Sequence, residues 1–318
     1  MKNLEKVPNF ICEVGDENFI AYNWPFGVKS NDTDSLYVNA EPIVKYLFPD
    51  FEDKSDKEKD KLLEKVALQY QDLINKYYNE MAVSIFNVKG SHRFEMKTEA
   101  VIRSAYFRAT RRYAQWITKS EGVDVDKLDI KGLEFMKANF PPIFGDFFNE
   151  TLEKVLKGGK QNDIDNALKK FKEKILSENM DFTLLGNPTS VKTLNKYLKS
   201  KPKSGEIFSI ISQGAPAPVK AAIKYNDLLK FWNLDKQHST IVQGDKVKWV
   251  YLNPNPYRIE AIAFLEFDIP ERIRTLIEQY IDRTKSFETI LESKLKGFYE
   301  DLNWDFNMNP YRNIIFEF

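Results

Sequence analysis

The stretch Asp32-Thr33-Asp34-Ser35-Leu36-Tyr37-Val38 places two carboxylates one residue apart, directly ahead of an apolar run. The run from Ser35 predicts a β-strand, and the residues before it predict the tight turn that leads into this strand. Because residues i and i+2 point the same way, we expect Asp32 and Asp34 to project together at a hairpin tip. Converging carboxylates suit Mg²⁺ ions that are shared with substrate phosphates. The same residues are also ordinary turn formers, since Asp and Ser side chains bond to nearby backbone.

Length and composition predict folded domains. The chain has 318 residues, 42% hydrophobic and 14% aromatic, which is enough for about two domains. Lys plus Arg and Asp plus Glu are 47 each, so only a local basic face could bind a polyanion. A single cysteine, Cys12, excludes an internal disulfide, and with only two histidines the chain gives no basis for a tetrahedral zinc site. No apolar run approaches the roughly 18 residues that span a membrane, and we expect a cytoplasmic protein without membrane contact.

Strands and one long helix are predicted between residues 55 and 107. Ser55 can cap an amphipathic helix that runs to about Asn79 and packs behind the sheet carrying Asp34. The apolar stripe of this helix is Leu62, Val66, Tyr70, Leu73 and Tyr77. The runs 84–88, 93–97 and 101–107 are typical of strands.

Basic and aromatic residues alternate around the last of these strands. The residues are Arg103, Tyr106, Phe107, Arg108, Arg111, Arg112, Tyr113 and Trp116. Basic side chains beside aromatic rings fit contacts with nucleic-acid phosphates. The alternative is a solvated strand face with no ligand.

These motifs resemble landmarks of family B DNA polymerases, in the expected order. The opening stretch resembles motif C, Tyr-Gly-Asp-Thr-Asp-Ser. The segment from Ala109 to Ala114 is similar to Lys-Lys-Arg-Tyr-Ala, and Lys131-Gly132-Leu133-Glu134 is similar to the family's Lys-Gly-Leu-Glu, which leads to a Pro. The resemblance covers about residues 33–318. It implies that Asp34 and Asp32 are catalytic metal ligands and that primer-template DNA is held by Arg111, Arg112, Tyr113, Lys131 and Gly132.

The first residues depart from the polymerase pattern. Ser30-Asn31 stands where Tyr-Gly is expected, and Val14 to Asp32 resembles the C-terminal piece of an intein. The resemblance implies a splice junction at Asn31, Asp32 and Thr33, with the Thr33 hydroxyl as nucleophile. Asp32 replaces the usual terminal Asn, and Asn31 stands where a His is typical. The alternative is a strand-rich cap on a split polymerase.

The second half of the chain is predicted to be mostly helical. Five lysines between residues 190 and 204 suit a duplex backbone, or else a solvated loop. Residues 219–229 resemble a thumb helix of T-even-type phage polymerases, the strands 244–252 and 259–264 are expected to pair, and a long helix is predicted from Pro270 to Leu302. The apolar end resembles the tails that dock on the sliding clamp, with Ile315, Phe316 and Phe318 as anchors; the alternative is packing on the chain's own core.

Together these features predict an α+β fold. We expect part of an antiparallel palm sheet with helices, a mostly helical thumb and a small β-rich N-terminal segment. The predicted domains are 1–32 (intein-like), 33–143 (palm), 144–304 (thumb) and 305–318 (clamp-binding tail).

The family's Asp-x-x-Ser-Leu-Tyr-Pro segment, which brings the second essential Asp, is absent, as is its Asn-Ser-x-Tyr-Gly run. The resemblance therefore implies the C-terminal subunit of a split polymerase of a phage-infected bacterium. An N-terminal polymerase chain would complete its two-Mg²⁺ site, and dNTP, primer-template DNA and a sliding clamp would be its other partners. The alternative function is a non-catalytic DNA-binding or replisome scaffold protein derived from a polymerase.

Overall fold

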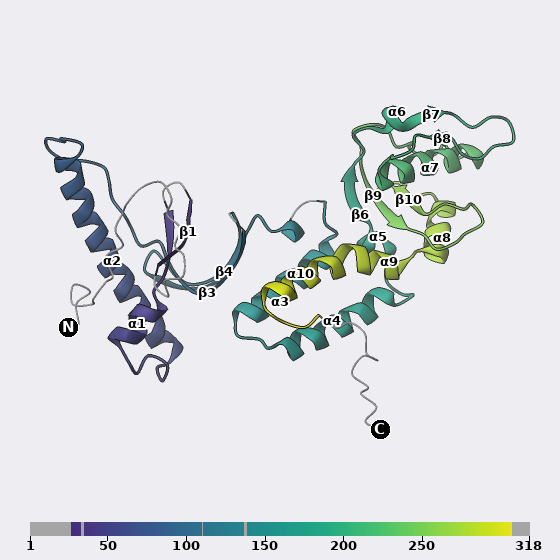
Figure 1. The fold of residues 1–318 in the computed structure, drawn as a ribbon. Coiled ribbons are helices and arrows are strands. Elements are labelled where there is room, and N and C mark those ends of the chain that lie inside the picture. Colours follow the sequence, from purple (N-terminus) through teal and green to yellow (C-terminus); the bar gives the residue numbers. More distant parts are fainter. Residues whose placement is uncertain (1–26, 33–34, 110, 137–138, 307–318) are drawn as a thin grey trace, which may run out of the picture. The chain divides into compact units, whose positions relative to one another are not determined.

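The chain forms two compact units, Met1–Gly132 and Leu133–Phe318 (Figure 1). The computed structural model describes residues 27–32, 35–109, 111–136 and 139–306. Helices and antiparallel sheets make up both units within these residues, which confirms the predicted α+β class. In the sequence, the boundary between the two units falls between Gly132 and Leu133. The predicted boundary between palm and thumb falls between residues 143 and 144.

The opening stretch lies in a β-hairpin of the first unit. Strand β1 (Gly27–Asp32) pairs antiparallel with β2 (Ser35–Asn39), with Asp32 opposite Ser35 and Gly27 opposite Asn39. The register shifts between Val28 and Ser30, which leaves a one-residue bulge in β1. The strand predicted from Ser35 is therefore confirmed. Thr33 and Asp34 connect the two strands and lie outside the described residues.

Two helices follow the hairpin and form a small core. Helix α1 (Glu41–Leu47) packs against the start of α2 (Asp56–Ser84), and Ile43, Val44 and Val66 are buried between them. The predicted cap is confirmed, because the Glu58 carboxylate accepts hydrogen bonds from the backbone N–H and hydroxyl of Ser55.

The apolar stripe of α2 is only partly covered. Leu62 and Tyr70 pack on the α1 cluster, but Leu73 and Tyr77 are 43% and 46% exposed. The stripe was predicted to pack behind the sheet that carries Asp34. Instead, the half of it that is covered packs on α1.

The predicted strands 84–88 and 93–97 are wrong. Residues 84–86 end α2 or form a turn, and the following segment returns along the helix without a strand partner (Figure 1). Its backbone groups bond instead to side-chain amides of α2. Asn75 accepts a hydrogen bond from the Met96 N–H (2.7 Å) and donates one to the Met96 carbonyl (2.9 Å), while Gln71 accepts one from the Thr98 N–H (2.7 Å).

The predicted strand 101–107 is confirmed as part of a three-stranded antiparallel sheet. Its strands β3 (Ala100–Ala109), β4 (Arg112–Ser120) and β5 (Val123–Lys131) lie in the order β3-β4-β5. Ion pairs tie the sheet to α2: Arg103 pairs with Asp60 and Asp56, and Lys119 with Glu64. Arg103 also lies over the Trp116 ring at 4.8 Å, so it serves the scaffold rather than a phosphate.

The second unit begins with packed helices. After a 3-10 turn (Glu134–Met136), α3 (Pro142–Leu156) packs on α4 (Gln161–Leu176) through the stacked rings of Phe147 and Phe171, 4.2 Å apart. Helix α10 (Ser293–Asp301) joins this group through Phe298, whose ring meets Phe148 edge-on (Figure 1).

A second sheet and its helices complete this unit. The sheet has the order β10-β9-β6, from β6 (Asn187–Ser190), β9 (Lys246–Tyr251) and β10 (Ala261–Phe264), and α7 (Ala217–Phe231) packs on it. The predicted pairing of the last two strands is confirmed. The short elements around the lysine-rich segment are α5 (Phe182–Leu185), α6 (Leu194–Tyr197), β7 (Leu198–Ser200) and β8 (Ile210–Ile211).

The helix predicted from Pro270 to Leu302 is broken. It divides into α8 (Glu271–Tyr280), α9 (Arg283–Phe287), a π-helical turn (Glu288–Glu292) and α10. The break lies at Ile281, whose extended backbone bridges Leu252, and the next N–H, of Asp282, bonds to the Tyr251 carbonyl. A tertiary backbone contact thus interrupts the helix, although the helical spacing of apolar residues in the sequence continues through the break.

Replacing Asn75 by Ala should destabilise the first unit. Both hydrogen bonds to Met96 are lost and the backbone groups of Met96 are left to find water, which costs about 2 kcal/mol. The Asn79→Ala variant is the matched control, because it removes one exposed hydrogen bond, to the His92 ring, and should cost less than about 1 kcal/mol. Urea unfolding monitored by circular dichroism measures both, and equal losses would contradict the role given to Asn75.

Candidate nucleic-acid interface

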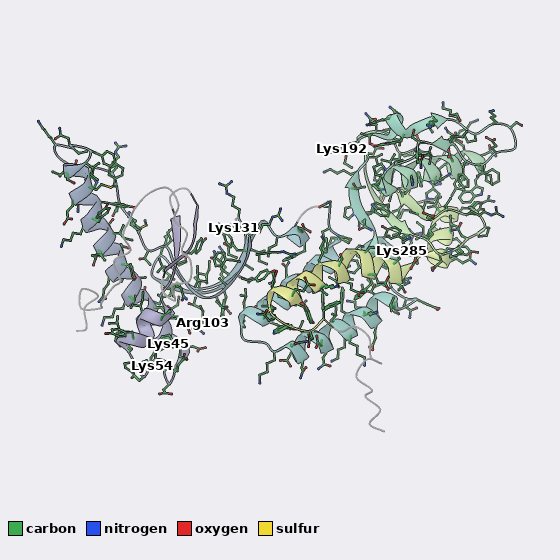
Figure 2. The ribbon with its side chains drawn as sticks, in the orientation of Figure 1. Lys45, Lys54, Arg103, Lys131, Lys192 and Lys285 are labelled. Carbon is green, nitrogen blue, oxygen red and sulfur yellow. The ribbon has the colours of Figure 1, made fainter. Side chains whose placement is uncertain are left out.

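A row of three side chains crosses one face of the β3-β4-β5 sheet near the β3–β4 turn. Phe107 pairs directly with Tyr113, and Tyr113 with Lys131, so the three side chains stand on the same face. The Lys131 ammonium lies 5.9 Å from the centroid of the Tyr113 ring. The arrangement puts a cation beside an aromatic ring at the end of the edge strand β5. Figure 2 labels Lys131.

Tyr37 joins the hairpin to this row. Its hydroxyl donates a hydrogen bond to the Tyr113 hydroxyl at 3.0 Å, and its ring meets Phe107 and Tyr113 edge-on at 5.4 and 5.7 Å. Since Tyr37 lies in β2, the strand that follows Asp34 is fixed to the end of the sheet that carries Arg112 and Tyr113. Burial, followed by the bond to Tyr113, raises the pKa of Tyr37 to about 12.

A second row supports the first from one step further along the strands. Gln115 pairs with Asp129, and its amide donates to the Asp129 carboxylate at 3.0 Å. The same carboxylate lies 3.8 Å from the Lys131 ammonium. The Tyr113 oxygen and then Asp129 raise the pKa of Lys131, so this side chain stays a cation at neutral pH.

Arg111 and Gly132 form a tight backbone contact beside the row. Both have left-handed backbone, with φ of 61° and 66°. A Cβ atom at position 132 would lie 2.0 Å from the Arg111 carbonyl oxygen, so only glycine fits there. This contact places the end of β5 against the β3–β4 turn. It explains why position 132 requires glycine even when no ligand is bound.

The structure brings the predicted DNA-binding residues together at one end of the sheet. Arg111 lies in the β3–β4 turn and Arg112 begins β4, Tyr113 and Lys131 belong to the row, and Gly132 touches Arg111. Arg112 and Lys131 are exposed. Exposed cations around a ring suit sequence-independent contacts with a sugar-phosphate backbone.

The other predicted site residues fall outside what the structure describes. Asp34 and Thr33, and the tail residues Ile315, Phe316 and Phe318, are outside the described ranges. Asn31 and Asp32 belong to strand β1, with no side-chain placement described. Among the described residues, no three His, Cys, Asp or Glu side chains gather as they would to hold a metal ion. In the same part of the chain no helix could cross a bilayer.

Sequence reasoning missed Tyr37, Gln115 and Asp129. Tyr37 belongs to the quoted stretch but was given only a strand role, and Gln115 and Asp129 become partners through the cross-strand register alone. Gln115 is 5% exposed, and its amide oxygen has no hydrogen-bond partner among the described residues. No spacing in the sequence marks such a residue.

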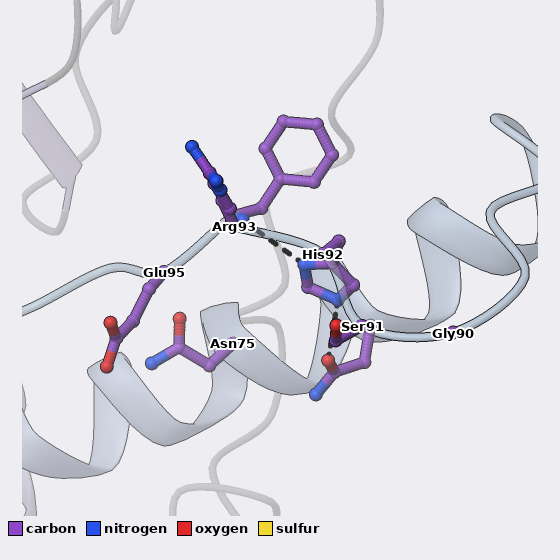
Figure 3. A pocket seen from close by; sticks show the side chains of 8 residues that line it. Asn75, Gly90, Ser91, His92, Arg93 and Glu95 are labelled. Atoms are coloured by element: carbon purple, nitrogen blue, oxygen red, sulfur yellow. Dashed lines mark hydrogen bonds between the residues drawn. The ribbon is translucent and has the colours of Figure 1, made fainter.

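A separate pocket of about 390 Å³ lies between α2 and the segment 90–95 (Figure 3). The His92 ring accepts a hydrogen bond from the Phe94 N–H through Nδ1, so Nε2 carries the proton that is donated to the Asn79 side chain. Asn75, which also lines the pocket, is bonded to the Met96 backbone. The side chains of Asn75, Asn79 and His92 therefore hold the segment 90–96 on α2. The pocket lies apart from the row formed by Phe107, Tyr113 and Lys131.

Comparison with known proteins adds no assignment: no family model matches this sequence, and no curated protein matches it either.

Replacing Gly132 by Ala should damage the sheet end. The substitution combines left-handed strain of about 1 kcal/mol with a backbone collision, and should cost about 3 kcal/mol or more. Gly122→Ala is the matched control, because Gly122 also has positive φ (80°) but nothing lies within 4 Å of its Cβ position. Chemical unfolding of the two variants gives the comparison, and a loss no larger in Gly132→Ala than in the control would refute the contact.

The Tyr37→Phe variant should change the alkaline limb of the stability curve. A phenol whose pKa rises from 10 to about 12 on folding keeps its proton longer in the native state, so stability is highest below pH 10 and falls as pH rises toward 12. Without this phenol, the fall between pH 10 and 12 should be shallower. Urea unfolding at pH 8, 10 and 11.5 measures it, and superimposable curves for variant and wild type would contradict the assignment.

Proposed function

We propose that this chain is the C-terminal subunit of a split family B DNA polymerase. The observation that carries the proposal is the Tyr37–Tyr113 hydrogen bond. It joins the strand after Asp34 to the sheet end bearing Arg112, Tyr113 and Lys131. Three sequence stretches that resemble polymerase motifs separately are thus supported by their proximity in space.

The proposed reaction is nucleotidyl transfer. The primer 3′-hydroxyl oxygen attacks the α-phosphorus of a dNTP, the bond to the β-phosphate breaks, pyrophosphate leaves and the hydroxyl proton is lost. Two Mg²⁺ ions, held by Asp34 with Asp32 and completed by the partner, would activate the hydroxyl and stabilise the leaving group. Tyr113 and the neighbouring cations would hold the primer-template against the sheet, and Gly132 would let the backbone come close to a phosphate.

The chain needs a partner for this reaction. An N-terminal polymerase chain would supply the missing carboxylate segment and the nucleotide-binding helix. Residues 1–32 would connect the two by protein trans-splicing. The Thr33 hydroxyl would take the partner's acyl group, breaking its bond to the intein segment that follows it, and the Asp32 side chain would cyclise onto its own carbonyl carbon, breaking the Asp32–Thr33 peptide bond. The acyl group would then move from the Thr33 oxygen to the freed Thr33 amine.

The second unit would serve as the thumb. The five lysines of the segment 190–204 are all exposed, which suits salt-dependent contact with the duplex backbone: Lys192, Lys196, Lys199, Lys201 and Lys203. The tail anchors Ile315, Phe316 and Phe318 would dock on a sliding clamp, and the whole assembly would work in the cytoplasm of an infected bacterium.

The second candidate is a non-catalytic DNA-binding or replisome scaffold protein. What favours it is the absence of the second carboxylate motif from this chain. It predicts DNA affinity that falls steeply with salt and no primer extension with any partner.

Primer extension with the N-terminal half of a family B polymerase ending in Tyr-Gly-Asp tests the proposal. The mixture should extend a primer, and Asp34→Asn should reduce the rate at least about 100-fold, because it removes a proposed metal ligand (a loss of about 3 kcal/mol in transition-state stabilisation). Asp53→Asn, at an exposed position after α1, should leave the rate unchanged. Equal rates for Asp34→Asn and wild type would rule out the catalytic assignment, and salt-dependent DNA binding without extension would favour the scaffold.

A further inference from the structure

Strand β1 is the sole strand partner of β2 among the described residues. The two form a separate two-stranded sheet, with β2 paired to β1 from Ser35 to Asn39. An isolated two-stranded hairpin is marginally stable in water, and the bulge in β1 removes one residue from the ladder. Strand β1 is therefore weakly held, and without it β2 would present a bare strand edge.

Strand β2 has an anchor that does not involve β1. Tyr37 bonds to Tyr113 and packs on Phe107, both from the β3-β4-β5 sheet. Asn39 lies next to α1, and its side-chain oxygen accepts a hydrogen bond from the Glu41 N–H. Strand β2 can therefore keep its place while its neighbour is exchanged.

Chain connectivity limits what can take the place of β1. Just two residues, Thr33 and Asp34, separate the paired residues Asp32 and Ser35. A segment that reaches the Thr33 position from the N-terminal side must turn as tightly and run back along β2. The last residues of the proposed partner, which end at this junction, would therefore need the same edge of β2 that β1 now occupies.

We propose that β1 is a placeholder strand, which the terminal strand of the N-terminal polymerase chain displaces by pairing with β2 in the same register. This inference rests on the proposed split polymerase and names the surface at which its halves first meet. Main-chain hydrogen bonds of an added strand supply the affinity, as in other cases of strand addition. While β1 is in place it competes with the incoming strand, so part of the partner's binding free energy is spent on displacing it.

The hairpin register decides which substitutions weaken β1. In a two-residue hairpin the closing pair, here Asp32 and Ser35, exchanges both backbone hydrogen bonds, and pairs alternate from there. The N–H of Ser30, opposite Tyr37, then points at β2, whereas that of Val28, opposite Val38, points away. Proline removes a ladder bond at Ser30 and no ladder bond at Val28.

The experiment compares Ser30→Pro with Val28→Pro in the full chain. Hydrogen exchange followed by mass spectrometry should show faster exchange of the β2 amides in Ser30→Pro and no change in Val28→Pro. Surface-immobilised N-terminal polymerase half ending in Tyr-Gly-Asp should bind Ser30→Pro about threefold to tenfold more tightly than wild type, as expected from the loss of one competing hydrogen bond. Val28→Pro should stay within about twofold of wild type.

A second variant guards against misfolding of the first. Ser30→Gly lowers β propensity without a ring, and should shift exchange and binding in the same direction by a smaller factor. If the β2 amides are exposed but the partner binds Ser30→Pro no better than Val28→Pro, or less well, β1 is not a placeholder. Primer extension by the same mixtures would then show whether the polymerase proposal stands. If the partner binds none of the chains, both proposals fail.

Discussion

The hydrogen bond between the hydroxyls of Tyr37 and Tyr113 links the β1-β2 hairpin to the β3-β4-β5 sheet of the first unit. One phenol comes from the strand after the paired aspartates and the other from the second residue of β4. Phe107 adds two ring contacts, with Tyr37 and with Tyr113. These three rings therefore set the position of β2 relative to the end of the sheet.

The scaffold around the cluster keeps the sheet end in place. The partly buried ion pair between Arg103 and Asp60 joins the middle of β3 to α2, and Lys119 joins β4 to the same helix. Asp129 holds both Gln115 and Lys131, so the cation of the interface is fixed from behind by a carboxylate. The exposed Lys131 is therefore held by the partly buried Asp129, and Arg103 and Lys119 hold the sheet itself on α2. Arg103 is therefore used in the scaffold, whereas Arg112 is exposed at the end of the sheet.

Much of the fold could be predicted where local chemistry decides it. The Asp-Ser turn and the β-forming residues after it gave the hairpin, and Ser55 with Glu58 gave the start of α2. Prediction failed where a distant group supplied the backbone partner. The segment 93–97 is not a strand, and its Met96 backbone bonds to the side-chain amide of Asn75 in α2. The apolar period after Pro270 is interrupted by the contact of Ile281 with Leu252. Periodicity carries no information about such contacts. For the interface, the resemblance indicated Tyr113, Lys131 and Gly132. Tyr37 became visible only through its tertiary hydrogen bond to Tyr113, and Gln115 only through its cross-strand pairing with Asp129.

A double-mutant cycle on Tyr37→Phe and Tyr113→Phe tests the central claim most directly. Each single variant removes one hydroxyl and keeps its ring, so the cycle isolates the hydrogen bond from the aromatic packing. The free energies of unfolding, measured in urea at pH 7, should give a coupling energy of about 0.5–1.5 kcal/mol. A coupling energy of zero within error would mean that the two hydroxyls do not hold the hairpin to the sheet.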